Sequence, residues 1–509
     1  MISIMLISAG LSYFLSLPFA SVLQGSGYRL RGLLRAKKGL IACLIYFAIS
    51  LAAELCVLLL LGGVAQKIVT FFVYISTGLF VCLIHKKIGI KMHYTRRLVR
   101  LLIASTLLYI AAYIGLFFTS VRGLWSVTPA TAPLVLAVTG FLMNPFENIN
   151  NQRYVKRAKS KLAAATGIKI GVTGSYAKTS VKCYLEKLLS LRYKTLASPA
   201  NYNTPMGVVK TVEEATGKED ALIFEMGARR NGDIRELCEM IHPDIGVITG
   251  IAPQHLETFG SIEAVMKEKN RLAECIPADK TVFYNLTDPL VRRLYEAREG
   301  KKIGVGYRDA DYIISDRHFT AAGSSFTLSK GEKSISIVMP CVGLACVIDL
   351  SLAAAVAIEL GVPRESVALA AKTAYSPSHR FEVVKSGAVT VIDDSYNINP
   401  IGAEVALDSL DLFEGGRKVV YTSGIVELGK EEEEYNRALG ERIAKTASIA
   451  VVCKGRYGDA VVRGISGATR EVAVIRVENT QEASSLFGSI LKKGDVLLIM
   501  SDLPRDYLL

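Results

Sequence analysis

The segment GVTGSYAKTS, residues 171–180, combines small residues, a lysine and hydroxyl side chains at spacings that suit phosphate binding. The apolar run IKIGVT before it is typical of a buried strand, and VKCYLEKLLSL after it is helix-prone. Backbone N–H groups at the start of that helix would bind phosphate oxygens, while Lys178 would reach the terminal phosphates and Thr179 would bind magnesium. The segment departs from the strict G-x-x-x-x-G-K-[ST] pattern at Val172 and Ala177. From these residues alone, an ordinary turn between strand and helix is an equal alternative.

Further motifs follow this loop in a fixed order, and together they resemble those of one enzyme family. They are NYNTPMG (201–207), FEMGARRNGDI (224–234), ITGIAPQHLETFGSIEAVMKEKNRLAE (248–274), SHRFEVV (378–384), VIDDSYNINP (391–400) and GIVELG (424–429). This series resembles the Mur ligases, the ATP-dependent amide-forming enzymes of peptidoglycan precursor synthesis, and among them the branch that adds D-alanyl-D-alanine. That family also lacks the first strict glycine, so Val172 agrees with it. Ala177 is a departure, because its methyl group could crowd a phosphate or strain the backbone at positive φ.

The resemblance implies a reaction in which ATP converts a carboxylate to an acyl phosphate, which an amine then attacks with release of ADP and phosphate. It implies catalytic roles for Lys178, Glu225, His255 and Lys269. Two magnesium ions would be bound by Thr179, Glu225, His255 and a carbamate on Lys269, whose oxygens suit a hard cation. Lys267 is an alternative position for that lysine. Considered as structure alone, these residues could be a solvated strand-end carboxylate, a loop histidine and a surface lysine.

Nucleotide and substrate contacts are also implied by the resemblance. Those for ATP are Gly174, Ser175, Lys178, Thr179, Ser180, Asn285, Arg380, Asp394, Tyr396 and Asn397. Asn201 and Asn203 would contact the substrate.

The chain departs from the family pattern mainly in regions that would handle the acceptor. Ala345 and Cys346 replace a His-Asn pair, His379 stands where a glycine usually precedes the arginine, and MSDLPRD replaces a K-G-S-R element. Apolar sequence also occupies the place of the N-terminal UDP-binding domain. We therefore expect ATP-driven ligation to be kept and the acceptor to differ.

The apolar sequence predicts an N-terminal membrane domain. Half of the residues are hydrophobic and the mean hydropathy is +0.33. Five stretches approach the roughly 20 apolar residues that cross a bilayer: 1–28, 39–66, 68–84, 101–121 and, more weakly, 123–145. Basic clusters at 29–38, 86–100 and 153–161 place those loops in the cytoplasm by the positive-inside rule. The expectation is a multi-pass plasma-membrane protein with its N-terminus outside, its catalytic domains in the cytoplasm and membrane lipid as a partner.

The charge distribution excludes some partners and sites. The net charge of +13 is concentrated in the apolar N-terminal third. Because this basic region is predicted to lie at a membrane, nucleic acid is not expected as a partner. Nine cysteines are scattered without a C-x-x-C pair, so neither a zinc ribbon nor a disulfide framework is indicated.

Beyond the apolar third, short β-rich runs alternate with helical ones, which predicts two doubly wound α/β domains. The expected organisation is a transmembrane domain of about five helices at 1–147, a basic helix on the membrane surface at 148–165, a P-loop central domain at 166–380 and a Rossmann-like domain at 381–509. The predicted fold class is thus a multi-span α-helical membrane domain followed by α/β domains.

The favoured function is a membrane-anchored, ATP-dependent amide ligase that adds an amino acid or a D-alanyl-D-alanine-like dipeptide to a cell-wall precursor. Alternatives are a ligase for a γ-linked polyamino acid or another lipid-linked acceptor, and a nucleotide-sensing scaffold with a weakened loop. The sequence leaves the acceptor, the amine and the oligomeric state open.

Overall fold

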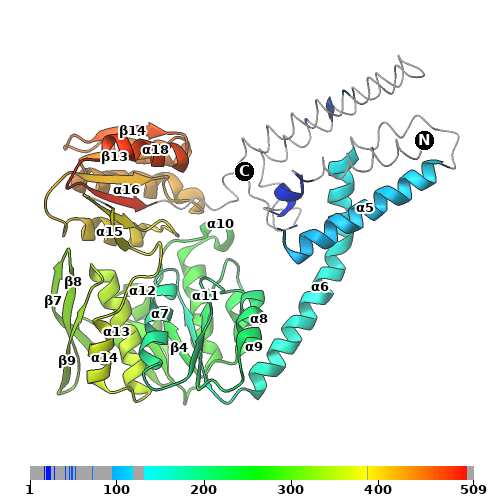
Figure 1. The fold of residues 1–509 in the computed structure, drawn as a ribbon. Coiled ribbons are helices and arrows are strands. Elements are labelled where there is room, and N and C mark those ends of the chain that lie inside the picture. The colour runs from blue at the N-terminus through cyan, green and yellow to red at the C-terminus, as the bar shows by residue number, and fades with distance from the viewer. Residues whose placement is uncertain are drawn as a thin grey trace. The chain divides into compact units, whose positions relative to one another are not determined.

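The computed structural model describes residues 94–117, 131–386 and 388–500, together with scattered positions between 17 and 72 (Figure 1). The chain divides into two compact units. One comprises residues 1–152 with 503–509, and the other comprises residues 153–502.

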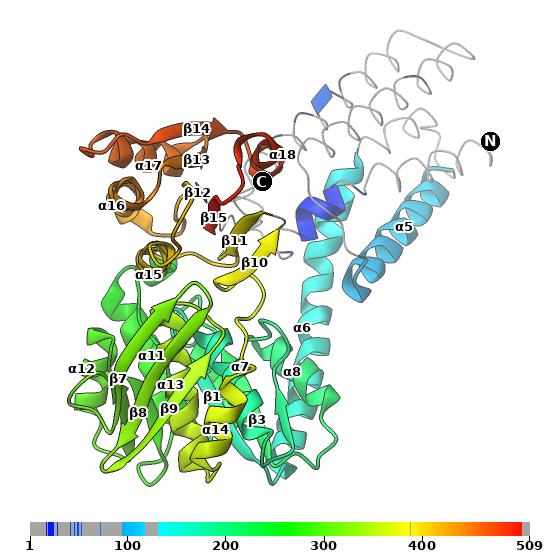
Figure 2. The ribbon, with the colours of Figure 1, turned by 60° about the vertical axis from the view of Figure 1, so that its left-hand side comes forward.

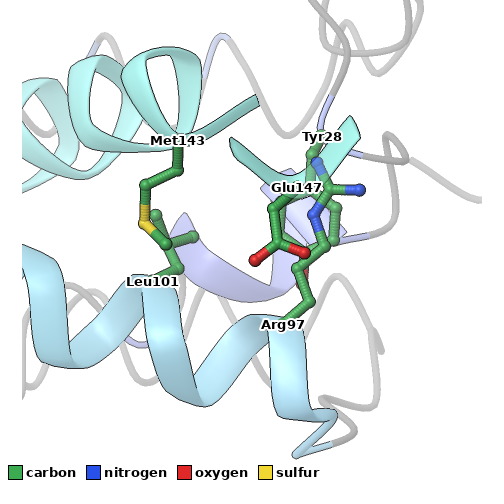
Figure 3. Close-up of a pocket in the computed structure, with 6 residues that line it drawn as sticks. Tyr28, Arg97, Leu101, Met143 and Glu147 are labelled. Carbon is green, nitrogen blue, oxygen red and sulfur yellow. The ribbon is translucent and has the colours of Figure 1, made fainter. Parts of the chain in front are cut away.

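In the first unit, polar contacts fix two long helices against each other: α5 (Arg96–Phe117) and α6 (Ala132–Ala164). Arg100 forms a two-pronged ion pair with Glu147, with both N–O distances at 2.8 Å. Arg97 donates to Oδ1 of Asn144 at 2.7 Å, and its guanidinium group lies 4.1 Å from the centre of the Tyr28 ring. Tyr28, Arg97 and Glu147, with Leu101 and Met143, surround a small pocket of about 10 Å³, room for a single water molecule (Figure 3).

The expected membrane domain is corrected by the helices that the structure describes, because none of them is long and apolar enough to cross a bilayer. Helix α5 overlaps the fourth predicted span, but its first turns carry arginines. Helix α6 overlaps the fifth span, yet it contains Pro145 and becomes polar and basic in its second half. The spans predicted at 1–28, 39–66 and 68–84 lie outside the described residues, apart from isolated positions.

The correction extends to what was built on those spans. The prediction of a multi-pass plasma-membrane protein with its N-terminus outside is corrected by the same finding on the described helices. The separate surface helix predicted at 148–165 is instead the second half of the continuous helix α6.

In the second unit, a nine-stranded sheet forms the first domain, with the order β2-β3-β1-β4-β5-β6-β7-β8-β9. Its strands are β1 (Ile168–Thr173), β2 (Thr195–Ala197), β3 (Ala221–Met226), β4 (Ile245–Ile248), β5 (Val282–Asn285), β6 (Lys302–Gly306), β7 (Tyr312–Thr320), β8 (Gly323–Lys330) and β9 (Lys333–Met339). Strands β2 to β7 pair in parallel, whereas β7, β8 and β9 form an antiparallel edge that the sequence analysis did not predict (Figure 2).

Helices cover both faces of this sheet because successive strand residues point to opposite sides. Ile170 and Val172 of β1 pack with α7 (Lys178–Leu189), α13 (Leu344–Glu359) and α14 (Arg364–Ala371). The other face packs against α8 (Pro205–Glu214), α9 (Asp233–Ile241), α10 (Leu256–Phe259), α11 (Ile262–Cys275) and α12 (Pro289–Ala297). The carboxyl ends of the parallel strands are thereby left for a site.

The second domain is a six-stranded sheet with the order β10-β11-β15-β12-β13-β14. Its strands are β10 (Glu382–Ser386), β11 (Val389–Asp393), β12 (Lys418–Thr422), β13 (Ile449–Cys453), β14 (Ala473–Val477) and β15 (Val496–Met500). Its helices are α15 (Pro400–Leu410), η3 (Gly429–Glu431), α16 (Glu432–Thr446), α17 (Arg456–Ser466) and α18 (Thr480–Ile490). All its pairings are parallel except β10 with β11. The α/β part of the predicted fold is therefore confirmed.

Candidate functional site

The loop between β1 and α7 has the backbone shape of a phosphate-binding loop. A side chain at Gly174 would overlap the hydroxyl of Thr249 and the backbone of Gly250, so only glycine fits there. Ala177 precedes the first residue of α7 with φ 65° and ψ −6°, in the left-handed region that disfavours residues other than glycine. The strain considered from the sequence is therefore present at Ala177.

Lys178 is folded back over this loop. Its Nζ donates to the carbonyl oxygens of Gly174, at 2.8 Å, and Ser175, at 3.2 Å. Burial lowers the pKa of Lys178 to about 8, against the opposing effect of Glu225. A bound polyphosphate would supply negative charge next to this half-buried ammonium group.

Glu225 lies next to the loop because β1 and β3 pair in register, with Val172 opposite Glu225. Its Oε2 accepts a hydrogen bond from the Thr179 hydroxyl at 3.0 Å, and its Oε1 accepts one from the Asn203 amide at 3.0 Å. Burial acts to raise the pKa of Glu225, but the ammonium groups of Lys182 and Lys178 outweigh it and the pKa is lowered. The structure thus brings Thr179, Asn203 and Glu225 together.

Lys182 also contacts Glu225, and sequence reasoning missed it. It lies one helical turn after Lys178, and its Nζ is 3.3 Å from Oε2 of Glu225. The same ammonium group donates to the carbonyl oxygen of Ala200, the residue before the NYNTPMG segment. The i, i+4 spacing from Lys178 was the available signal, since such residues share a helix face.

The two candidate lysines of α11 have different surroundings. Lys267 is exposed, whereas Lys269 is only 3% exposed. Lys269 makes no hydrogen bond or ion pair with any residue that the structure describes, and burial lowers its pKa to about 7, with Lys178 acting in the same direction. Its environment therefore differs from that of a surface lysine.

His255 precedes α10, and its Nδ1 pairs with Oε2 of Glu427 from the GIVELG segment of the second domain. Burial lowers the pKa of His255, although Glu427 opposes the shift. The pairing occupies one of the two ring nitrogens that could bind a metal. Within the described ranges, no three His, Cys, Asp or Glu side chains gather into a preformed metal site.

Asn285 and Asn201 have contrasting environments. Asn285 is buried and satisfied within the protein, since its amide donates to the Thr249 carbonyl at 2.7 Å and its oxygen accepts from the Thr287 backbone at 3.0 Å. Asn201 is exposed. These contacts give Asn285 a role in fixing its own loop.

The predicted nucleotide residues of the second domain lie near its first strands. The Arg380 guanidinium group is 3.9 Å from the centre of the Tyr396 ring. Asp394 accepts a hydrogen bond from the Phe381 backbone at 3.1 Å, and burial raises its pKa to about 6 although Arg380 opposes the shift. Asn397 is partly buried in the same loop.

Ser175 and Ser180 have different surroundings in the phosphate loop. Ser175 is buried, and its hydroxyl has no hydrogen-bond partner in the described part of the chain. Ser180 forms a hydrogen bond with Asp349. Burial raises the pKa of Asp349 well above its ordinary value, although this hydrogen bond opposes the shift. Sequence reasoning missed Asp349, and no spacing signal pointed to it.

The departures from the family pattern occupy defined places. His379 has φ 63°, the conformation that glycine adopts readily, and its ring pairs with Asp393 at 2.7 Å. Cys346 lies 3.6 Å from the Ser376 hydroxyl, in the segment between the two domains.

Known proteins are similar to this chain in both sequence and fold. The chain matches the Mur ligase middle domain over residues 172–357 and the Mur ligase glutamate ligase domain over residues 379–503. It is 32% identical over 410 residues to a UDP-N-acetylmuramoyl-tripeptide--D-alanyl-D-alanine ligase of Mycobacterium tuberculosis, covering 73% of this chain and 78% of that protein. The enzyme of the same name from Bacillus subtilis is 27% identical over 334 residues, covering 65% of this chain and 72% of that protein.

Solved structures agree in fold. MurF ligase from Thermotoga maritima in complex with ADP superposes with a TM-score of 0.62 at 23% identity, covering 70% of this chain and 82% of that one. MurF from Acinetobacter baumannii gives a TM-score of 0.63 at 21% identity, covering 70% and 78%. With the sequence relatives, these matches show that the chain belongs to the Mur ligase family of ATP-dependent, ADP-forming amide ligases.

Proposed function

We propose that this enzyme joins an amino acid or a D-alanyl-D-alanine-like dipeptide to a peptidoglycan precursor, through an acyl phosphate made from ATP. The observation that carries the proposal is the 3.0 Å contact between Thr179 and Glu225 beside the half-buried Lys178. The two sequence relatives named above are both UDP-N-acetylmuramoyl-tripeptide--D-alanyl-D-alanine ligases, and these names support this substrate class.

The chain's own residues divide the work on ATP. Lys178 would leave its loop carbonyls for the terminal phosphates, and the N-terminus of α7 would bind phosphate oxygens. Arg380 and Tyr396 would hold the nucleotide from the second domain, with Asp394 and Asn397 beside them. Closure of the two domains would then exclude water from the acyl phosphate.

The donors around Glu225 fit magnesium, because a hydroxyl and a carboxylate oxygen already lie together in a buried setting. Thr179 and Glu225 would hold one ion, and His255 with a carbamate on Lys269 would hold a second. Magnesium supplies charge neutralisation at the phosphates. Lys269 could bind the second ion only after modification, because its ammonium group repels cations.

The acceptor and amine are tested by measuring ADP release from the full chain with a UDP-muramoyl tripeptide and D-alanyl-D-alanine, omitting each in turn. We expect ADP and the dipeptide-extended product in equal amounts only with both present. Lys178→Ala should abolish both, and Lys187→Ala on the same helix should not. Retained ATP binding without turnover on a panel of acceptors and amines would contradict the proposal and favour a nucleotide-sensing scaffold.

A further inference from the structure

Tyr176, inside the phosphate loop, is attached to the rest of the site at three points. Its hydroxyl donates to Oδ2 of Asp288 at 2.8 Å. Its carbonyl oxygen accepts a hydrogen bond from the Thr249 hydroxyl. Its ring lies directly on Gly250, where any side chain would overlap the ring atoms. The residue therefore connects the loop to the segment after β4 and to the start of α12.

Asp288 is a rigid anchor for this contact. It is 4% exposed, and its Oδ1 accepts hydrogen bonds from the backbone N–H groups of Leu290, at 2.8 Å, and Val291, at 3.2 Å, which cap α12. Its Oδ2 also accepts one from the Ile251 backbone at 2.8 Å. Both carboxylate oxygens are thus held by backbone N–H groups of α12 and of the segment after β4, so the carboxylate is fixed independently of the phosphate loop.

The loop needs such an anchor because of the residue that follows. Ala177 adopts a left-handed conformation that its Cβ disfavours, and it is the residue from which α7 begins. Without restraint, the loop would relax toward ordinary backbone angles and move the N–H groups that are to bind phosphate. Ser175, on the other side of Tyr176, is held by a backbone bond to Gly250 at 2.7 Å, so the restraint extends along the loop.

We propose that Tyr176 is a positioning residue whose bond to Asp288 holds Ala177 in its left-handed conformation and keeps the phosphate loop ready for ATP. The hydrogen bond of the Tyr176 hydroxyl thereby offsets the backbone strain at Ala177. The proposal predicts that removing this hydroxyl weakens ATP binding by an amount that depends on the residue at position 177.

The test is a double-mutant cycle on ATP binding, measured by calorimetry with full-length protein and magnesium. Tyr176→Phe should weaken binding about tenfold with Ala177 present, because binding must then restore the strained loop. In the Ala177→Gly background, the same substitution should weaken binding less than about twofold, since glycine adopts the conformation freely. Tyr284→Phe is the matched control, because its buried hydroxyl has no partner among the described residues.

Equal losses in both backgrounds, or no loss with Ala177 present, would overturn the proposal. The ATP-binding measurement rests on the proposed function, so a second measurement without nucleotide separates the two. Hydrogen exchange of the peptide spanning residues 173–183 should rise in Tyr176→Phe and return to the wild-type rate when Ala177→Gly is added. If wild-type protein bound no ATP, the proposed function would fail while hydrogen exchange still decided the role of Tyr176.

Discussion

The ammonium group of Lys182 lies 3.3 Å from Oε2 of Glu225, and both side chains are almost fully buried, at 2% and 1% exposure. A buried charge that loses its partner is strongly destabilising. Lys182 also holds the Ala200 carbonyl, so it ties the helix after the phosphate loop to the segment that contains Asn203. Lys182 therefore links the helix after the phosphate loop to the segment proposed to contact the substrate.

Replacing Lys182 by methionine should lower the free energy of unfolding by about 3–5 kcal/mol, because Glu225 is then left charged in a dry environment. Adding Glu225→Gln should recover a large part of that loss. Denaturant unfolding of the two single variants and the double variant measures both effects. Lys187→Met on the same helix is the control, since Lys187 makes no ion pair within the described residues. Additive losses from the two substitutions would show that the pair is not coupled.

Lys269 is expected to carry a carbamate when the protein is supplied with labelled bicarbonate. Its buried amine has no partner among the described residues, and the modified side chain would instead offer two oxygens to magnesium. A carbamate carbon resonance should appear in the ¹³C spectrum of the wild-type protein and be absent from Lys269→Met. Lys267→Met, two residues away and exposed, should keep the resonance. Its loss from Lys267→Met alone would transfer the role to that residue.

Asp394 should make stability depend on pH between about 4 and 6. Burial raises its pKa from 3.8 to about 6, so the protonated form favours folding. The contribution is fully present below pH 4 and is lost as the pH rises through 6. Asp394→Asn, neutral at every pH, should therefore be more stable than wild type above pH 6 by roughly 1–3 kcal/mol, with little difference near pH 4. Unfolding in guanidinium across this range measures the effect, with Asp279→Asn at an exposed position as control. A pH-independent difference would rule out this account.

The α/β half of the fold was predictable because its signals are local. A buried parallel strand is a short apolar run bounded by glycine or polar residues, and IKIGVT coincides with β1. The antiparallel edge formed by β7, β8 and β9 gives a weaker signal, since its exposed positions carry polar side chains that read as loop. The membrane prediction assigned the arginines at 96–100 and the polar residues after 147 to segments flanking the apolar runs, whereas the structure includes them in the same helices, α5 and α6.

The sequence predicted which residues belong to the site, but few of their contacts. The proximity of Glu225 to the loop was predictable, because both lie at the carboxyl ends of parallel strands that pair in register. The contact of His255 with Glu427 joins residues far apart in the chain, and no spacing rule reaches across two domains. Tyr176 was overlooked because an aromatic residue in a loop has no pattern of its own, and its partner Asp288 lies 112 residues away.

Ala177→Gly should increase the free energy of unfolding by about 1 kcal/mol, because the left-handed conformation strains alanine by about 1–2 kcal/mol and glycine by almost nothing. Part of that gain is offset by the greater entropy of glycine in the unfolded chain. Ala438→Gly, at an exposed position in the middle of α16, is the matched control and should lose about 1 kcal/mol. The effect of an Ala→Gly substitution on the free energy of unfolding should thus have opposite signs at the two positions, which denaturant titrations of both variants would measure.

ATP should also bind Ala177→Gly at least as tightly as wild type, since no methyl group faces the phosphates. Weaker binding by this variant would mean that the alanine contacts the nucleotide favourably.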